Sequence, residues 1–157
     1  MATVIEDVVK PQYFKDLSIV SMASQIFDNL LAEVFPELAL EMEENCMESS
    51  LFSIPWFVCL FTKGFINNVS QYLLEEIILL GQKYSLCYVL VKISLGIITA
   101  LFLCGDLEYE RELFCLKDVI EQKVQEISLE GIKQGLLYFE LDYELFLLVE
   151  QHYVKKR

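Results

Sequence analysis

The feature that most constrains the fold of this chain is a long apolar run at residues 86–104, LCYVLVKISLGIITALFLC. On a membrane-insertion scale each of its aliphatic or phenylalanine side chains contributes about −0.3 to −0.6 kcal/mol, whereas the central Lys92 costs about 2.5 to 3.5 kcal/mol. The run is near the minimum length of a membrane span and contains a lysine. We therefore expect a buried core helix with Lys92 at its edge. A membrane anchor through residues 86–104 is the alternative.

Two helices in series are expected before this run, in the segment SIPWFVCLFTKGFINNVSQYLLEEIILLG at residues 53–81. Ser53 is a candidate N-cap, Pro55 suits the first turn of a helix, and Gly64 suits its end. An Asn-Asn pair and a glycine bound the second helix at residues 67–81. Because this second helix is apolar nearly all round, we expect it to be buried on most sides.

The rest of the chain also has helical periodicity, and no segment alternates for long enough to form a sheet. The fold class is therefore predicted to be all-α. Further helical segments are expected at residues 11–17, 21–35, 37–47, 107–127 and 129–154, the last of them capped by Ser128. Four acidic residues in or beside the third of these segments have their simplest interpretation as a solvated face, and the alternative is a partner-binding patch. They are Glu41, Glu43, Glu44 and Glu48.

Composition argues against several classes of function. A formal net charge of −12 repels phosphate backbones, so no nucleic-acid partner is expected. The five cysteines form no Cys-x-x-Cys pair and the chain has one histidine, so we expect no metal site and reduced thiols, as in a cytoplasmic protein. The first ten residues include acids and no long apolar run, which argues against a secretion signal.

No familiar catalytic motif is present, because the sequence contains no P-loop, no Gly-x-Ser-x-Gly and no His-Glu-x-x-His. Adjacent carboxylates such as Glu75 and Glu76 project about 100° apart on a helix, so they do not converge on one substrate. We expect no catalytic residue and no cofactor. Composition and spacing alone thus indicate an acidic, all-helical interaction module.

Four segments carry a family resemblance through their order: FDNLLAEVFPEL at residues 27–38, SIPWFVCLFTKGF at 53–65, YLLEEIILLG at 72–81, and the apolar run at 86–104. In this order the chain resembles the C-terminal half of a TBC domain, the helical domain of GTPase-activating proteins for Rab GTPases. The family's Trp-Asp pair would fall on Leu74-Glu75, with Glu76 as the alternative acid. The residues that match the family motif, interpreted as structural, are Phe27, Pro36, Leu38, Pro55, Trp56, Phe57, Phe61, Glu75 and Gly81.

The resemblance also identifies two residues that are missing. TBC domains are similar to one another in supplying an arginine from an I-x-x-D-x-x-R motif and a glutamine from Y-x-Q, both in the N-terminal half. For GTPase activators such an arginine increases the rate by about 10³–10⁵. Here the arginines are Arg111 and Arg157; Arg111 lacks an Asp three residues before it, and no tyrosine has Gln two residues on. We therefore expect no GTPase activation by this chain alone, and we expect Arg111 to be a buried or salt-bridged surface residue.

We interpret residues 1–10 as a tail, residues 11–104 as a TBC-like C-terminal half-domain and residues 105–157 as a helical extension. The expected function is that of a truncated TBC domain that binds or regulates small GTPases in membrane traffic, in the cytoplasm and peripheral to endomembranes. Hydrophobic residues make up 55% of the chain. This surplus predicts an exposed apolar patch that meets a Rab-type GTPase, the missing N-terminal half or a second copy of the chain. The alternatives are an all-helical scaffold unrelated to GTPases and a membrane-anchored protein.

Overall fold

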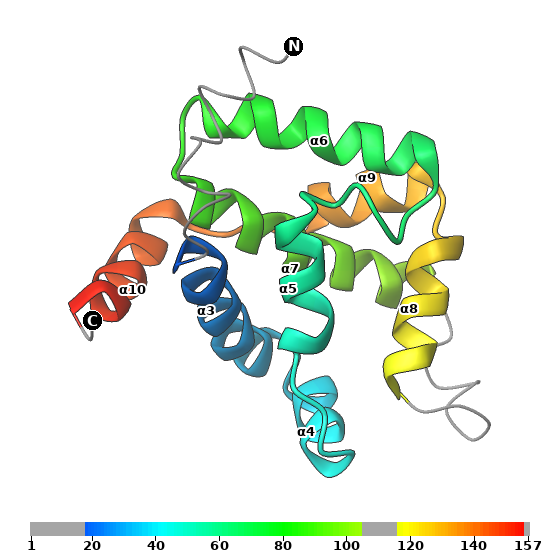
Figure 1. The fold of residues 1–157 in the computed structure, drawn as a ribbon, viewed down its shortest axis with the longest axis horizontal. Helices are drawn as coiled ribbons and strands as arrows, with labels where there is room; N and C mark the ends of the chain where they lie inside the picture. Colours follow the sequence, from blue (N-terminus) through cyan, green and yellow to red (C-terminus); the bar gives the residue numbers. More distant parts are fainter. Residues whose placement is uncertain (1–17, 105–115, 156–157) are drawn as a thin grey trace.

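The computed structural model describes residues 18–104 and 116–155, and every regular element within these ranges is an α-helix (Figure 1). This confirms the predicted all-α class. The helices are α3 (Ser18–Val34), α4 (Pro36–Glu44), α5 (Ser50–Val58), α6 (Asn67–Gly81), α7 (Leu86–Cys104), α8 (Leu116–Glu126), α9 (Leu129–Tyr138) and α10 (Tyr143–Lys155). The expected segment at residues 11–17 and the position of Arg111 lie outside the described residues.

The apolar helix α7 is the centre of the fold, as the sequence predicts. It packs against α3, α6, α8 and α9, and its residues from Val89 to Leu101 are buried except for the half-buried Lys92. Its two buried hydroxyl groups bond to carbonyls one turn earlier, Ser94 to Leu90 at 2.9 Å and Thr99 to Leu95 at 2.8 Å, so neither is left unpaired in the core.

The position of α7 bears on the alternative interpretation of residues 86–104 as a membrane anchor. Within the described residues, α7 is the one helix long and apolar enough to cross a membrane, and 78% of that stretch is already buried by the rest of the fold. Core helices of water-soluble domains have this property. The buried position of α7 therefore supports the core-helix interpretation over the anchor.

Helices α7 and α9 cross at very short range. A Cβ added to Gly135 of α9 would lie 2.5 Å from the Gly96 carbonyl oxygen and 2.5 Å from the Ala100 Cβ, both on α7. Only glycine allows this approach, because any side chain would occupy the space of the α7 backbone. Helices α9 and α10 are thus part of the same core, because Ile132 of α9 and Phe146 of α10 are buried in it.

The structure corrects the expected start of α5. The helix begins at Ser50 after Ser49, so Ser53 is not its N-cap and Pro55 lies inside it rather than in its first turn. The Ser53 hydroxyl is buried and lies 3.0 Å from that of Ser24 on α3, where it joins two helices. Pro55 has no N–H to donate to the Leu51 carbonyl, so α5 lacks one of its internal hydrogen bonds.

The expected end of α5 at Gly64 is also wrong, because the helix stops at Val58. Leu60 and Phe61 take left-handed backbone angles, with φ of 50° and 60°, and the Phe61 N–H donates to the Trp56 carbonyl at 2.8 Å. Left-handed backbone costs a non-glycine residue about 1–2 kcal/mol. Burial of a Leu or Phe side chain contributes about 1.5–3 kcal/mol, and both side chains are buried, so packing outweighs the backbone preference.

Helix α6 has the expected bounds but not the expected burial. Its buried residues are Val69, Leu73 and Ile77, which form one stripe, whereas Leu79 is 59% exposed. The reason is its place at the edge of the array, where it contacts α7 and α9 on one side (Figure 1). Helix α6 therefore carries apolar side chains on an exposed side as well as on its buried side.

The single helix expected at residues 129–154 is two helices, α9 and α10. Ser128 caps α9 as expected, with its hydroxyl accepting from the Gly131 N–H at 3.1 Å. The chain then breaks, and Asp142 caps α10 by accepting from the N–H groups of Glu144 and Leu145 at 2.9 and 3.2 Å. Asp142 was a readable N-cap signal that the periodicity concealed.

Two other boundaries differ. Helix α4 ends at Glu44, earlier than expected, because Cys46 has a φ of 53° and the Met47 N–H turns back to the Met42 carbonyl at 2.8 Å. In the helix expected at residues 107–127, the described part is α8, and its first nine expected residues lie outside the described ranges.

Candidate functional site

The aromatic members of the family motif form a packed cluster between α3 and α5. The Phe27 and Phe57 rings meet edge to face with centroids 6.4 Å apart, and Phe57 meets Phe61 at 6.1 Å in the same way. Trp56 tilts against Phe61 at 6.1 Å. All four side chains are buried. The structure therefore places these four side chains in the packed core, and their interpretation as family-motif residues stays a prediction.

The other motif residues are scattered. Pro36 is the first residue of α4 and is exposed, whereas Leu38, two residues later, is buried. Pro55 is exposed within α5, and Gly81 is the last residue of α6. Pro36 and Gly81 thus mark helix ends, and Leu38 is a packing residue.

The two candidate acids on α6 have different surroundings. Glu75 is exposed, whereas Glu76 is half-buried and hydrogen-bonds with Tyr72. Burial and the Glu76 carboxylate raise the pKa of Tyr72, and the Lys133 ammonium lies 5.4 Å from the Tyr72 ring centroid. Tyr72 thus contacts both the Glu76 carboxylate on its own helix and Lys133 of α9, while Glu75 is exposed to solvent.

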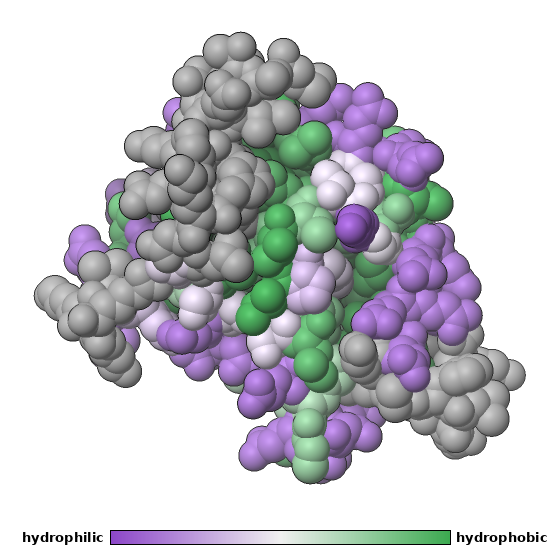
Figure 2. Space-filling view, viewed as in Figure 1, coloured by the Kyte–Doolittle hydropathy of each residue, from purple (hydrophilic) through white to green (hydrophobic). Residues whose placement is uncertain are grey.

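An apolar stripe lies on the outer face of α5. Leu51, Ile54 and Val58 follow the i, i+3, i+7 spacing of one helical face and are 48%, 38% and 39% exposed. Figure 2 shows an apolar band through the middle of this face of the molecule, with hydrophilic residues beside it. These three residues lie on a different face of α5 from the buried Trp56 and Phe57.

A second exposed apolar group belongs to α9 and α10. It comprises Leu137, Tyr138, Leu145 and Leu148, each at least 62% exposed. Together with the α5 stripe it fits the exposed apolar surface that the hydrophobic surplus predicted. Large exposed apolar side chains on neighbouring turns are typical of interaction surfaces.

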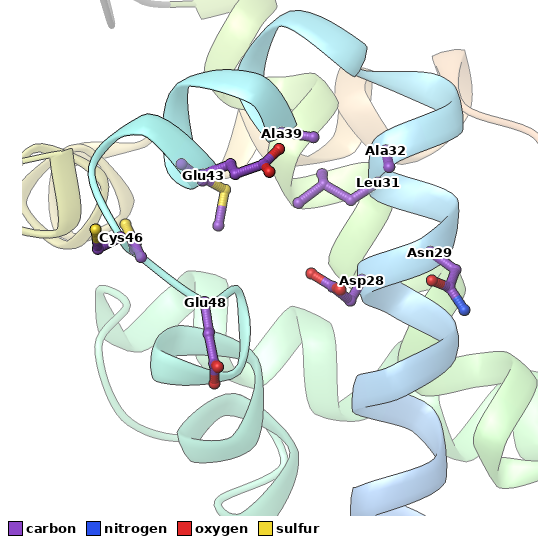
Figure 3. Close-up of a pocket in the computed structure, with 10 residues that line it drawn as sticks. Asp28, Asn29, Leu31, Ala32, Ala39, Glu43, Cys46 and Glu48 are labelled. Carbon is purple, nitrogen blue, oxygen red and sulfur yellow. The ribbon is translucent and has the colours of Figure 1, made fainter.

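A cleft opens between α3, α4 and the turn that follows α4 (Figure 3). Its volume is about 520 Å³. Asp28 and Asn29 come from α3, Glu43 from α4, and Cys46 and Glu48 from the turn; the remaining lining residues are Leu31, Ala32, Ala39, Met42 and Met47. We call this the α3–α4 cleft. Three chain segments form it, which no local sequence pattern predicts.

A smaller cleft, of about 210 Å³, lies between α5 and α8 beside Pro55 and Trp56. Lys63 and Glu121 also line it. Most of its other lining residues are apolar.

Titratable groups elsewhere are structural. Tyr84, Tyr88 and Tyr143 pack with ring centroids 4.8 to 4.9 Å apart, too close to enclose a ligand. The Tyr88 hydroxyl donates to the Leu141 carbonyl, and burial is the main cause of the raised pKa of Tyr88. Burial also raises the pKa of Glu150, against opposing hydrogen bonds with Cys87 and Ser85. Among the described residues, no group of three or more His, Cys, Asp or Glu side chains is placed to hold a metal ion.

Comparison with known proteins adds the decisive observation. The family model described as the Rab-GTPase-TBC domain matches residues 4–103. The chain belongs to this family. No curated protein and no solved structure gives a significant match.

The TBC match explains the order of elements from α3 to α7. Members of the family are GTPase activators, and their partners are Rab GTPases. The matched region ends at the last turn of α7, so α8, α9 and α10 follow it. In this chain α9 nevertheless covers α7 directly. The proposed boundary between residues 104 and 105 stays a prediction.

Proposed function

We propose that this TBC-family chain binds a Rab-type small GTPase without accelerating GTP hydrolysis. The family match over residues 4–103 is the observation that carries the proposal, since Rab GTPases are the partners of the family. The second support is chemical. The printed sequence contains neither the I-x-x-D-x-x-R nor the Y-x-Q pattern, so the cationic and water-orienting groups of such activators have no equivalent in it.

The magnitude of that loss is large. An arginine that neutralises charge on the transferring phosphoryl group contributes about 10³–10⁵ in rate. The acidic character of the chain would act in the opposite direction, because carboxylates near the γ-phosphate oppose the build-up of negative charge. Binding to a GTPase and activation of it are therefore separable, and we propose that this chain retains the first.

The apolar stripe of α5 suggests how activation could be supplied from outside. We propose that Leu51, Ile54 and Val58 pack against the part of a TBC domain that carries the arginine and glutamine, or against a second copy of the chain. In support, the stripe lies on the helix that carries the family's Trp-Phe motif. A cytoplasmic location at the surface of endomembranes belongs to the same proposal, since membrane-bound Rab GTPases would be met there.

The test uses the full chain and a panel of purified Rab GTPases loaded with GTP. Binding is measured by biolayer interferometry, and single-turnover hydrolysis is followed by phosphate release. We expect binding to at least one Rab and no increase in its hydrolysis rate. Acceleration that Arg111→Ala abolishes would refute the catalytic part, and absence of binding to every Rab in both nucleotide states would refute the whole.

The stripe is tested separately by size-exclusion chromatography with light scattering. Ile54→Ser, on the exposed face, should reduce self-association or association with a TBC N-terminal half. The matched control is Leu40→Ser on α4, which removes an exposed leucine elsewhere. Equal effects of the two substitutions would show that the α5 stripe has no special role.

A further inference from the structure

The geometry points to the α3–α4 cleft as a docking site for a basic, amphipathic segment of a protein partner, whose arginine or lysine side chains enter it. This inference does not depend on GTPase binding. It rests on the chemistry of the cleft, which combines an apolar floor with an acidic rim.

The floor of the cleft is made of buried apolar side chains. Leu31 comes from α3, Met42 from α4 and Met47 from the following turn, and none is more than 9% exposed. Arginine and lysine carry a long methylene stem below the charged group, and that stem packs favourably on apolar surface. Methionine adapts its shape to such a stem better than branched side chains do.

The rim carries the opposite chemistry. Asp28, Glu43 and Glu48 bring three carboxylates from three segments, and none of the described residues that line the cleft is basic. The Asp28 carboxylate is held in place by the Ser49 hydroxyl, which is itself buried and donates to it at 2.8 Å. In Figure 3 the Asp28 carboxylate points from α3 toward the turn that carries Cys46 and Glu48. A fixed carboxylate at the edge of an apolar floor suits a guanidinium or ammonium group.

The shape of the cleft suits a long cationic side chain. Its carboxylates line a cleft of about 520 Å³, and no group of three or more His, Cys, Asp or Glu side chains in the described residues is placed to hold a metal ion. A long cationic side chain can lie across the apolar floor and reach a carboxylate with its tip. Asn29, Ala32 and Glu43 on the rim are exposed, so the cleft is open to a macromolecule.

Charge alone would not make this cleft special, because the whole chain carries −12 and attracts any basic peptide. The test must therefore separate the cleft from the overall field. Two exposed glutamates serve as matched controls on the same helices without lining the cleft: Glu33 on α3 and Glu44 on α4. Their neutralisation removes the same total charge as neutralisation of Asp28 and Glu43.

The experiment measures fluorescence anisotropy of a labelled amphipathic peptide of about fifteen residues, long enough to form a helix, with arginines on one face and leucine and alanine elsewhere. A second peptide replaces each arginine by citrulline, which keeps the shape and removes the charge. Ionic strength is held at about 0.15 M so that long-range attraction is screened.

We expect the arginine peptide to bind and the citrulline peptide not to bind. The double variant Asp28→Asn, Glu43→Gln should weaken binding about tenfold or more, whereas Glu33→Gln, Glu44→Gln should weaken it less than about threefold. The Asp28→Asn change keeps an acceptor for the Ser49 hydroxyl, and circular dichroism checks that both doubles are folded. Equal weakening by the two doubles, equal binding of the citrulline peptide, or binding of spermine but not of the arginine peptide would overturn the inference.

Discussion

The crossing of α7 and α9 makes the sharpest stability prediction, which concerns Gly135→Ala. The added Cβ would lie 2.5 Å from the Gly96 oxygen, 2.5 Å from the Ala100 Cβ and 2.7 Å from the Ala100 nitrogen. Two of these are backbone atoms, which cannot rotate away as a side chain can. To restore an ordinary contact of about 3.5 Å, the two helices must separate by about 1 Å.

The expected cost follows from two opposing effects. Extra atoms in a packed core cost about 1–3 kcal/mol, and contact with backbone places this substitution at the upper end. In the opposite direction, the higher helix propensity of alanine relative to glycine stabilises the helix by about 1 kcal/mol. The net loss is therefore about 2 kcal/mol, or about 4–8 °C in Tm for a chain of this size. Urea denaturation followed by far-ultraviolet circular dichroism measures it.

The control is Gln134→Ala, on the exposed side of the same helix, which should change stability by less than about 0.5 kcal/mol. Adding Ala100→Gly to Gly135→Ala removes one of the three close contacts and should restore part of the loss, which a double-mutant cycle detects. If Gly135→Ala proved as stable as the original chain or more stable, the close approach of α7 and α9 would be wrong.

Two further predictions concern buried polar groups. Ser53→Ala leaves the Ser24 hydroxyl without its partner in a buried site and should lower the free energy of unfolding, measured by urea denaturation, by about 1–3 kcal/mol. The double variant with Ser24→Ala should lose less stability than the sum of the two single variants. Losses that simply add would contradict a paired interaction. For Glu150, burial raises the pKa from 4.5, so the folded state holds the proton more tightly than the unfolded state does. The carboxylate therefore lowers stability above its folded pKa, and that cost disappears as pH falls. Glu150→Gln should then stabilise the chain at about pH 7 and less so at about pH 4, and the same change at both values would exclude this titration.

Local sequence signals succeeded where a helix is defined by its own residues. The bounds of α7 and α6 follow from their apolar runs and flanking glycine and asparagine residues. Ser128 caps α9 because an N-cap needs only its own hydroxyl and an N–H group three residues later. The burial of Trp56 and Phe57 also follows from a local signal, because the apolar residues around them have the spacing of one helical face.

The failures have one common origin, which is packing between segments far apart in the chain. Leu60 and Phe61 follow the end of α5 with left-handed backbone angles because their side chains are buried in the core. The helix therefore ends before it reaches Gly64. The Ser53 hydroxyl, expected to cap α5, instead bonds with the hydroxyl of Ser24, which lies 29 residues away in the sequence. Helix α6 leaves Leu79 exposed because it packs against α7 and α9 through the opposite side of the helix, which carries Val69, Leu73 and Ile77.

The sequence by itself determined the helical class, the central apolar helix and the family, because helix periodicity and motif order are written in neighbouring residues. Tertiary structure alone decided the surfaces. The α3–α4 cleft needs α3, α4 and the following turn to meet, and the close crossing at Gly135 needs α9 to fold back on α7. The physical reason is that local hydrogen bonds and periodicity act over one or two turns, whereas a cleft and its charges arise from which faces of distant helices are buried against each other.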